Sequence, residues 1–316
     1  RHPWRNGLIS SVVYQEDDGR IIGCLGSLRR PMRWKGKTIQ MAISHNFMVD
    51  PGSRSTLAGM QLLKGFFEGP QDLSLAEGNH LSRKVWEGMG GAVAYPYSLT
   101  WTCALRPCRF ALSVLRERGF PAALTAALKP LGSLLDASLN RLPGSPFRRR
   151  APRLPGRALD EETFLARLPA FGSAYQLQPE YDRGSLEWLL RFLSRRQGLG
   201  ELRRGAVQGD RQDVVGWYLY YLKPGGRCQV LQIVAHPSSR EEVLDHLIHD
   251  AWRQGAAALS GQVEPRWLPA LATRSCLLTQ SGSWMLVHSR NPEVVQAFHR
   301  GDAFLSRLEG EWWIGL

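Results

Sequence analysis

The sequence lacks the short motifs that identify many enzyme and binding classes. It contains no Walker phosphate loop, no dinucleotide-binding glycine fingerprint, no zinc-finger spacing and no Ser-His-Asp order. Its five cysteines are odd in number and include no Cys-x-x-Cys pair, so we expect neither a disulfide framework nor a zinc ribbon. The sequence therefore predicts a cytoplasmic protein without metal ligands.

Long apolar runs are also missing. No uncharged apolar run reaches the roughly 18 residues that span a bilayer, and no signal-peptide pattern opens the chain. We expect a protein that is soluble or peripheral to a membrane. Because the sequence starts at Arg1 and a strand-like run follows at residues 8–14, we also expect upstream residues to be missing.

Acidic residues are scarce in one segment. Residues 106–158 hold ten arginines and one lysine against Glu117 and Asp136, so most of the net charge of +12 lies there. This concentration makes nucleic acid an unlikely partner for the rest of the chain. Leucines at helical spacing and frequent prolines predict a basic Pro/Arg-rich linker that contains an amphipathic helix. One alternative is a membrane-surface helix, with anionic lipid as partner through residues 120–150, and the other is a patch that binds nucleic acid.

The stretch from Phe47 to Leu63 predicts an anion site. An apolar strand end runs into a Pro/Gly turn, and a helix with apolar residues at helical spacing follows. Unpaired N–H groups at a helix N-terminus favour negative charge, and Arg54 adds a cation with a planar fork of donors. Phosphate is the ligand that this combination predicts.

This stretch resembles motif A of the GNAT acyl-CoA N-acyltransferase superfamily, Arg/Gln-x-x-Gly-x-Gly/Ala. Arg54 and Gly59 occupy its first and last positions, and Leu57 replaces the middle glycine. The resemblance implies acetyl-CoA or another acyl-CoA as cofactor. It also implies cofactor contacts from the strand and from the loop: Phe47, Met48, Val49, Arg54, Ser55, Thr56, Leu57, Ala58 and Gly59.

A second GNAT motif, Asn-x-x-Ala-x-x-x-Tyr, is matched in part. Asn79 and Ser82 keep its first two positions, and Trp86 replaces the tyrosine that protonates the leaving thiolate in many family members. These three residues are further cofactor-binding candidates. An indole N–H cannot act as a general acid near neutral pH. Tyr95, with Tyr97 beside it, is the nearest phenol in the sequence.

The general base has two candidates in the sequence. His45 lies on the strand before the phosphate loop, and an unperturbed imidazole titrates near neutrality. Glu77 ends the adjacent predicted strand, where the resemblance implies that the sheet opens to admit the thioester. Together with Tyr95, these residues are the candidate catalytic groups.

The strand–Pro–Arg–helix layout returns at residues 234–245 and predicts an internal repeat. This second copy lacks the loop glycines and places Glu241, Glu242 and Asp245 on the first helical turns, where carboxylates would repel pyrophosphate. His246 and His249 follow on the same helix, but the sequence signals no further metal ligand. The second copy is therefore expected not to bind coenzyme A.

Taken together, these patterns predict an α/β protein with two GNAT-like domains, each a mixed, mostly antiparallel sheet flanked by helices. The expected parts are an acyl-CoA-binding domain at 1–105, the linker at 106–158 and a degenerate domain at 159–316. The predicted function is acyl transfer to a primary amine of a small molecule or peptide. A catalytically inactive binding module, favoured by Leu57 and Trp86, is one alternative. A peripheral membrane enzyme acting on a lipid or surface-polysaccharide precursor is the other.

Overall fold

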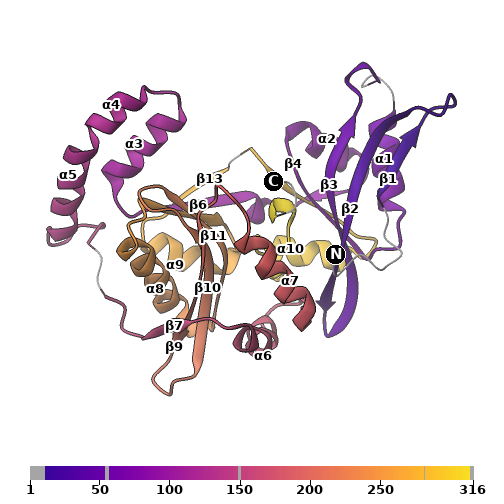
Figure 1. The fold of residues 1–316 in the computed structure, drawn as a ribbon. Helices are drawn as coiled ribbons and strands as arrows, with labels where there is room; N and C mark the ends of the chain where they lie inside the picture. The colour runs from indigo at the N-terminus through magenta and orange to yellow at the C-terminus, as the bar shows by residue number, and fades with distance from the viewer. Residues whose placement is uncertain (1–10, 54–56, 149–150, 281, 314–316) are drawn as a thin grey trace. The chain divides into compact units, whose positions relative to one another are not determined.

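The chain folds into two compact units built from interleaved segments (Figure 1). The computed structural model describes residues 11–53, 57–148, 151–280 and 282–313. Unit 1 comprises Arg1–Leu99, Leu168–Leu190 and Gln280–Leu316, and unit 2 comprises Thr100–Arg167 and Arg191–Thr279. Each unit contains one mixed sheet with helices packed against it, which confirms the predicted fold class.

The sheet of unit 1 has the order β1-β2-β3-β4-β14-β5, with β8 also paired to β2. β1, β2 and β3 are antiparallel, β3 and β4 are parallel, and β14 is antiparallel to both β4 and β5. Lys35 and Gly36 both have positive φ in the two-residue turn between β2 and β3, as a tight hairpin requires. The strands are β1 (Val12–Gln15), β2 (Ile21–Trp34), β3 (Lys37–Val49), β4 (Leu73–Gly78), β5 (Ala92–Val93), β8 (Leu177–Pro179) and β14 (Trp284–His288).

Successive residues of these strands alternate between two cores. On β3, Met41 and Ile43 join one cluster, while Ala42 joins the other. The first cluster receives Phe298 of α10 (Pro292–Arg300), and the second receives Leu62 and Phe66 of α1 (Ala58–Phe67). Both faces of the sheet are therefore covered. The other short elements of this unit are α2 (His80–Gly88), η1 (Pro51–Ser53), η2 (Tyr95–Ser98) and η5 (Glu311–Trp313).

The sheet of unit 2 has the order β13-β6-β12-β11-β10-β9-β7. It repeats the pattern of the first sheet, since β9, β10 and β11 are antiparallel, β11 and β12 are parallel, and β12 and β6 are antiparallel. All nine residues of the central strand β10 are buried. The strands are β6 (Leu99–Ala104), β7 (Gly156–Ala158), β9 (Glu201–Gln208), β10 (Val214–Leu222), β11 (Arg227–Ala235), β12 (Ala258–Gln262) and β13 (Leu277–Gln280).

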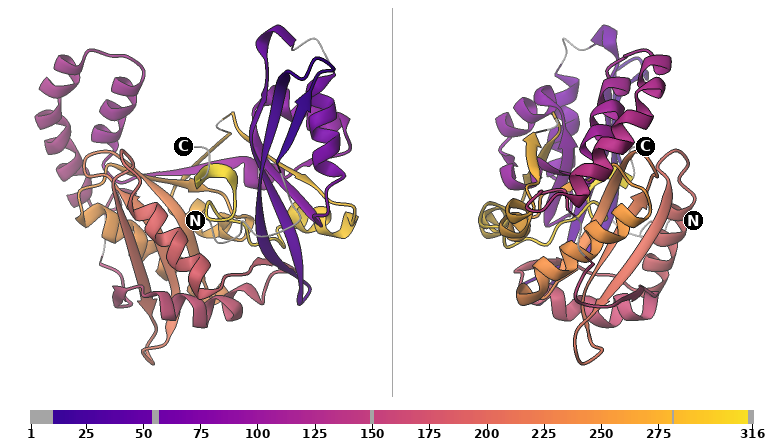
Figure 2. Two further views of the ribbon diagram at one scale, coloured as in Figure 1. Left: turned by 45° about the vertical axis from the view of Figure 1, so that its right-hand side comes forward. Right: turned by 90° about the vertical axis from the view of Figure 1, so that its left-hand side faces the viewer.

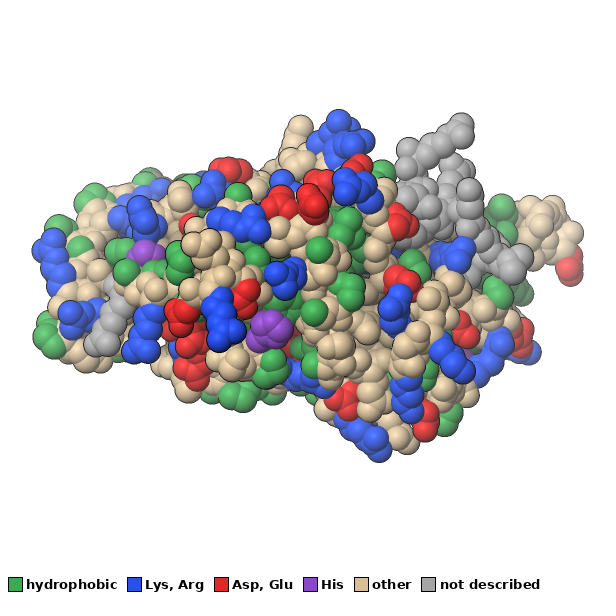
Figure 3. Space-filling model, turned by 90° about the horizontal axis from the view of Figure 1, so that it is seen from below, with side chains coloured by type: hydrophobic (Ala, Val, Ile, Leu, Met, Phe, Trp, Pro, Cys, Tyr) green, Lys and Arg blue, Asp and Glu red, His purple; other side chains and the backbone are tan. Residues whose placement is uncertain are grey.

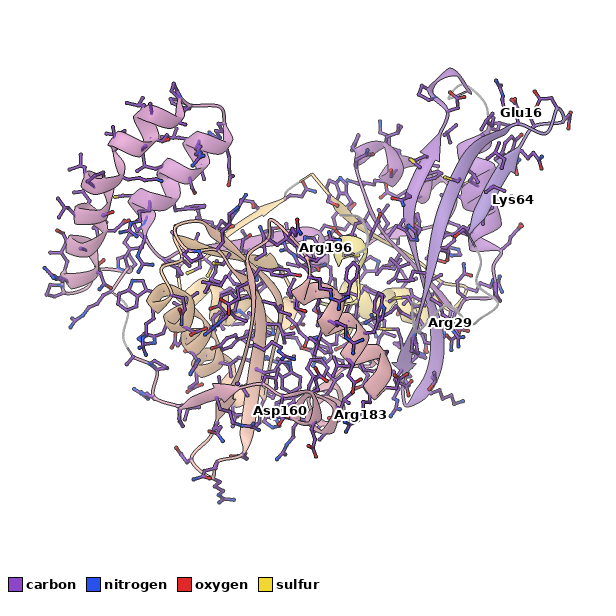
Figure 4. The ribbon with its side chains drawn as sticks, viewed as in Figure 1. Glu16, Arg29, Lys64, Asp160, Arg183 and Arg196 are labelled. Atoms are coloured by element: carbon purple, nitrogen blue, oxygen red, sulfur yellow. The ribbon has the colours of Figure 1, made fainter. Side chains whose placement is uncertain are left out.

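The helices of unit 2 include three in the segment that was expected to be a linker. These are α3 (Pro107–Glu117), α4 (Ala122–Ala127) and α5 (Lys129–Arg141), which form a hairpin of their own (Figure 2). The boundary between the two units falls inside two helices, α6 (Glu161–Gly172) and α7 (Arg183–Ser194). Asp160, labelled in Figure 4, caps α6 by accepting the Thr163 N–H at 2.6 Å. The remaining elements are η3 (Pro237–Ser239), α8 (Arg240–Arg253), η4 (Pro265–Trp267) and α9 (Leu268–Thr273).

Each half of the chain gives one strand to the other half's sheet. β6, from the N-terminal half, pairs with β12 of unit 2, and β14, from the C-terminal half, pairs with β4 and β5 of unit 1. β13 and β14 are close in sequence but belong to different sheets. The boundaries of the two units therefore differ from those expected at residues 105 and 159. The cause is that inward and outward alternation marks a strand without specifying its neighbour.

Candidate functional site

A cavity opens in unit 1 where two parallel strands separate. β3 and β4 are paired only between residues 41–43 and 73–75, although both strands continue beyond this point. A cavity of about 250 Å³ lies there, lined by residues 44–47 of β3 and 76–78 of β4, and by Glu311 of η5. Asn79, Ser82 and Trp86 line it from the side of α2. The structure thus brings together the predicted residues His45, Phe47, Glu77, Asn79, Ser82 and Trp86.

A bulge in β3 shapes the wall that holds His45. The register with β2 shifts between Cys24 and Gly26, and Asn46 adopts a positive φ of 51°. His45 pairs with Gly26, and a side chain at Gly26 would come within 2.4 Å of the imidazole, so only glycine leaves room for the ring. His45 Nδ1 is buried without a hydrogen-bond partner among the described residues. Burial lowers the pKa of His45, which favours the neutral ring.

Glu311 enters the cavity from the C-terminal segment and joins the ends of the two separated strands. Its carboxylate accepts the Glu77 N–H, with 3.1 Å between N and Oε2, and also the Asn46 N–H. Burial raises the pKa of Glu311 to about 7, and the nearby charge of Glu77 acts in the same direction. A carboxyl group with such a pKa is suited to exchange protons near neutral pH.

Glu77 faces Glu311 in a reciprocal arrangement. The Glu77 carboxylate accepts backbone N–H groups of Glu311 and Trp312, so each of the two residues binds the backbone of the other. Burial raises the pKa of Glu77, whereas the charge of Arg307 opposes that shift. Gly310 permits the close approach, because a Cβ there would lie 2.8 Å from Glu77 Oε1. Glu77 therefore acts as an anchor for the segment that carries Glu311.

Sequence reasoning missed Glu311. The residue lies more than two hundred positions from the strands that it joins, and no local motif marks it. The available signal was a glycine followed by an acid and two tryptophans near the C-terminus. Glycine before large apolar residues indicates a tight approach of the backbone to another element.

Tyr95 does not line the cavity. It lies on η2 with half of its surface exposed, and its hydroxyl accepts a hydrogen bond from Arg83 Nη2 at 3.0 Å. Tyr97 is buried, and its hydroxyl donates to the Ala303 carbonyl. Among the described residues lining the cavity there is no tyrosine.

The α2 residues have structural roles beside the cavity. Asn79 Oδ1 caps the helix by accepting the Leu81 and Ser82 N–H groups at 3.0 Å each. Trp86 is 3% exposed, and its indole N–H donates to the Val287 carbonyl on β14 at 3.0 Å. The Trp86 indole thus joins β14, the strand from the C-terminal half of the chain, to α2, which forms one wall of the cavity.

The predicted phosphate loop is described in part. Arg54, Ser55 and Thr56 lie outside the described residues, whereas Met48 and Leu57 are exposed and Ala58 is buried. Val49 and Phe47 lie beside Gly59, and a Cβ on Gly59 would meet both at ordinary contact distance. Over its described residues the first turn of α1 has no acidic residue and no side-chain cap, so its dipole is not offset locally.

The corresponding helix of unit 2 has the opposite charge pattern. β11, η3 and α8 repeat the order of β3, η1 and α1, and Glu241 and Glu242 lie on the first turn of α8. Arg274 forms ion pairs with Glu241 and Asp245 at 2.9 and 2.8 Å. Arg274 thus pairs with two of the carboxylates, while Glu242 keeps a buried Oε2 without a hydrogen-bond partner among the described residues, so the first turns of α8 do not suit pyrophosphate.

The described residues contain no cluster of three or more His, Cys, Asp or Glu side chains that could hold a metal ion. His246, one of the two histidines on α8, is hydrogen bonded through Nδ1 to the Tyr218 hydroxyl at 2.9 Å. None of the described helices is long and apolar enough to cross a membrane.

Solved structures with similar folds were found by comparison. A GCN5-related N-acetyltransferase from Anabaena variabilis superposes on 89% of this chain and 63% of its own, with a TM-score of 0.53 and 14% identity. The chain has a GNAT fold. A conserved protein of unknown function from Enterococcus faecalis, a probable N-acyltransferase, matches 91% of this chain and 63% of its own, with a TM-score of 0.54 and 10% identity.

The GNAT fold of this chain thus covers under two thirds of the length of these two neighbours. No family model matches the sequence. No curated protein sequence matches it either.

Proposed function

We propose that this protein is an acyl-CoA-dependent N-acyltransferase that transfers an acetyl or longer acyl group to a primary amine. The amine belongs to a small molecule or a peptide. One observation carries the proposal: a carboxyl group with a pKa of about 7, that of Glu311, lines the cavity where β3 and β4 separate in a GNAT fold. Such a group can remove a proton from an ammonium ion at neutral pH.

The residues beside the cavity fit an acyl-CoA. The α1 N-terminus is free of acidic side chains over its described residues and follows directly on Arg54, Ser55 and Thr56, which supply a cation and two hydroxyl groups in the sequence. This combination favours a pyrophosphate. Phe47, Met48 and Val49 form the end of β3 that leads from the cavity toward α1, and their backbone would pair with the pantetheine arm of a bound acyl-CoA.

Bound acyl-CoA supplies the thioester, whose C–S bond breaks as the new C–N bond forms. An acceptor that arrives as an ammonium ion loses two protons in the reaction. The Glu311 carboxylate accepts the first and passes it to solvent, and the second leaves the nitrogen once the C–N bond has formed and goes to the departing thiolate. Glu77 keeps Glu311 in place through the reciprocal backbone hydrogen bonds. His45, with an unpartnered buried Nδ1, is the second candidate base.

A binding module without catalytic activity is the rival function. Two observations favour it: the Trp86 N–H is engaged by Val287, and no tyrosine is among the described residues that line the cavity. The described lining of the cavity therefore offers no phenol, and the Trp86 indole cannot protonate a leaving thiolate. The rival predicts that acyl-CoA binds without release of free thiol in the presence of any amine.

The decisive experiment is a thermal-shift assay with a panel of acyl-CoAs, followed by a thiol-release assay with amines. A ligand at about 100 times its dissociation constant stabilises the native state by about 2.7 kcal/mol. Arg54→Glu should abolish the shift. Lys64→Glu, an exposed charge reversal on α1, is the matched control and should keep it. Absence of a shift with every acyl-CoA would contradict the proposal, and a shift without thiol release would favour the binding module.

A further inference from the structure

The helices α3, α4 and α5 of unit 2, here called the arm, are held together along one face of α5. Asp136 of α5 accepts the N–H groups of Cys108 and Arg109 at 2.8 and 3.1 Å and so caps the start of α3. Gly132 lies against Leu112 and Cys108, where a Cβ would be 3.3 Å from the Leu112 side chain. These contacts fix which side of α5 faces α3.

The opposite side of α5 is apolar and exposed. Leu131 and Leu134 are 56% and 68% exposed, although leucines are usually buried. Among the described residues, sixteen large hydrophobic side chains are exposed, and seven of them belong to the arm and its ends. These seven are Phe120, Leu124, Leu128, Leu131, Leu134, Leu135 and Leu142.

The charge around this apolar surface is mostly positive. The arm holds two acidic residues: Asp136, which is 6% exposed and engaged with α3, and Glu117 at the end of α3, which pairs with Arg227 at 3.2 Å. The cations of residues 118–148 are Arg118, Lys129, Arg141 and Arg148, followed by further arginines in the sequence. At the extreme left of Figure 3, the end where Figure 1 shows α5, the described side chains are basic and hydrophobic with no acidic one in view.

We propose that this face of the arm, centred on Leu131 and Leu134, docks in the plane of an anionic phospholipid bilayer. Exposed apolar side chains on a helix whose segment is rich in cations, and whose two carboxylates are engaged within the protein, match an interface that is apolar below and negatively charged at its surface. Aliphatic leucines suit fluid acyl chains because they require no shaped pocket. The inference does not depend on the proposed transferase activity.

The test is co-sedimentation of the full chain with vesicles. Binding is expected to vesicles of phosphatidylcholine with about a quarter phosphatidylglycerol at low salt, to fall at high salt, and to be weak with phosphatidylcholine alone. Arg141→Gln is expected to reduce the partition coefficient about fivefold, since one cation near the surface contributes about that factor. No binding to the anionic vesicles at low salt would overturn the proposal.

The apolar contribution is tested with a double variant. Leu131→Glu with Leu134→Glu should lower the partition coefficient at least about tenfold, because two leucines no longer enter the bilayer. Leu277→Glu with Leu278→Glu is the matched control on β13, where both leucines are exposed, and should bind as the unmodified protein does. Equal loss in both variants would overturn the proposal. A dimer in solution that only the arm variant disperses would assign the face to a second copy and would also overturn it.

Discussion

The Glu77 N–H donates to Glu311 Oε2 over 3.1 Å, while the Glu77 carboxylate accepts backbone N–H groups from Glu311 and Trp312. This exchange joins the end of β4 to the C-terminal 3-10 helix. These hydrogen bonds hold the Glu311 carboxyl group in the cavity where β3 and β4 separate, although no local sequence motif marks this residue.

Glu311→Gln should lower acyl transfer by about 100-fold or more, because a positioned general base contributes roughly that factor. In the unmodified protein the rate should fall as the pH falls through about 7, since Glu311 is then protonated. The variant should lose this dependence on pH. Measurement of kcat/KM against pH checks the prediction, and an unchanged profile in Glu311→Gln would contradict the role of Glu311 as the titrating base.

The raised pKa of Glu311 predicts that the stability of the folded protein changes with pH. A carboxyl group with a folded-state pKa of about 7, above its ordinary value of 4.5, favours folding when protonated, so stability falls as the pH rises from about 4.5 through 7. The difference in Tm between Glu311→Gln and the unmodified protein should therefore shift in favour of the variant over this range. A constant difference would show that the pKa of Glu311 is not raised.

Gly310→Ala should destabilise unit 1 by about 1–3 kcal/mol, because the added methyl group would lie 2.8 Å from Glu77 Oε1 and displace the C-terminal segment. Gly88→Ala at the end of α2 is the matched control. Its Cβ meets no atom within 4 Å, so it should be neutral or stabilise by up to about 1 kcal/mol. Urea denaturation of both variants checks the difference.

Glu309 anchors the same segment through a buried ion pair. Arg30 and Glu309 are both inaccessible to solvent and approach to 3.8 Å, and Tyr181 donates to Glu309 while accepting from Arg30 Nη2 at 2.8 Å. Glu309→Ala leaves a buried cation and should cost about 3–5 kcal/mol of unfolding free energy. Tyr181→Phe should cost about 1–3 kcal/mol. A smaller loss in Glu309→Ala than in Tyr181→Phe would contradict this account.

Asp160→Ala should remove the cap of α6 and cost about 1 kcal/mol near neutral pH. Hydrogen bonds from Thr163 and Arg157 lower the pKa of Asp160 to about 2, below its ordinary 3.8, so this contribution is present above about pH 4 and is lost as the pH falls through about 2. Asp160→Asn should keep most of the cap without this titration. Urea midpoints between about pH 2 and 7 test both variants.

Local chemistry made much of the fold predictable. The turn at Lys35 and Gly36 was predictable because a pair that ends in glycine stands between two strand-like runs, and both residues adopt the positive φ that such a turn needs. Asn79 as a helix cap and the absence of acids at the start of α1 follow from the same kind of rule. These features depend on neighbours in the sequence, for which propensity and periodicity are informative.

Local sequence could not predict which strands pair with β6 and β14, or the role of Glu311. Trp284–His288 is a nearly continuous apolar run, as expected for a strand that is buried on both faces, but such a run fits either sheet. Glu311 is defined by contacts across the fold, and only the unusual Gly310 next to it hints at a close approach. Similarly, the spacing of the leucines in α5 predicted an amphipathic helix but not what would cover its apolar side, and the structure exposes Leu131 and Leu134.

The pairing of β6 and β14 with strands from the other half of the chain affects folding during synthesis. During synthesis, β4 leaves the ribosome long before residues 284–288 and must wait for them with one edge unpaired. The first sheet is completed only after residue 288 has emerged, so it cannot mature before the second sheet, whose strands all lie between residues 99 and 280. Such distant pairing predicts slow folding and a need to shield the β4 edge from other chains during translation.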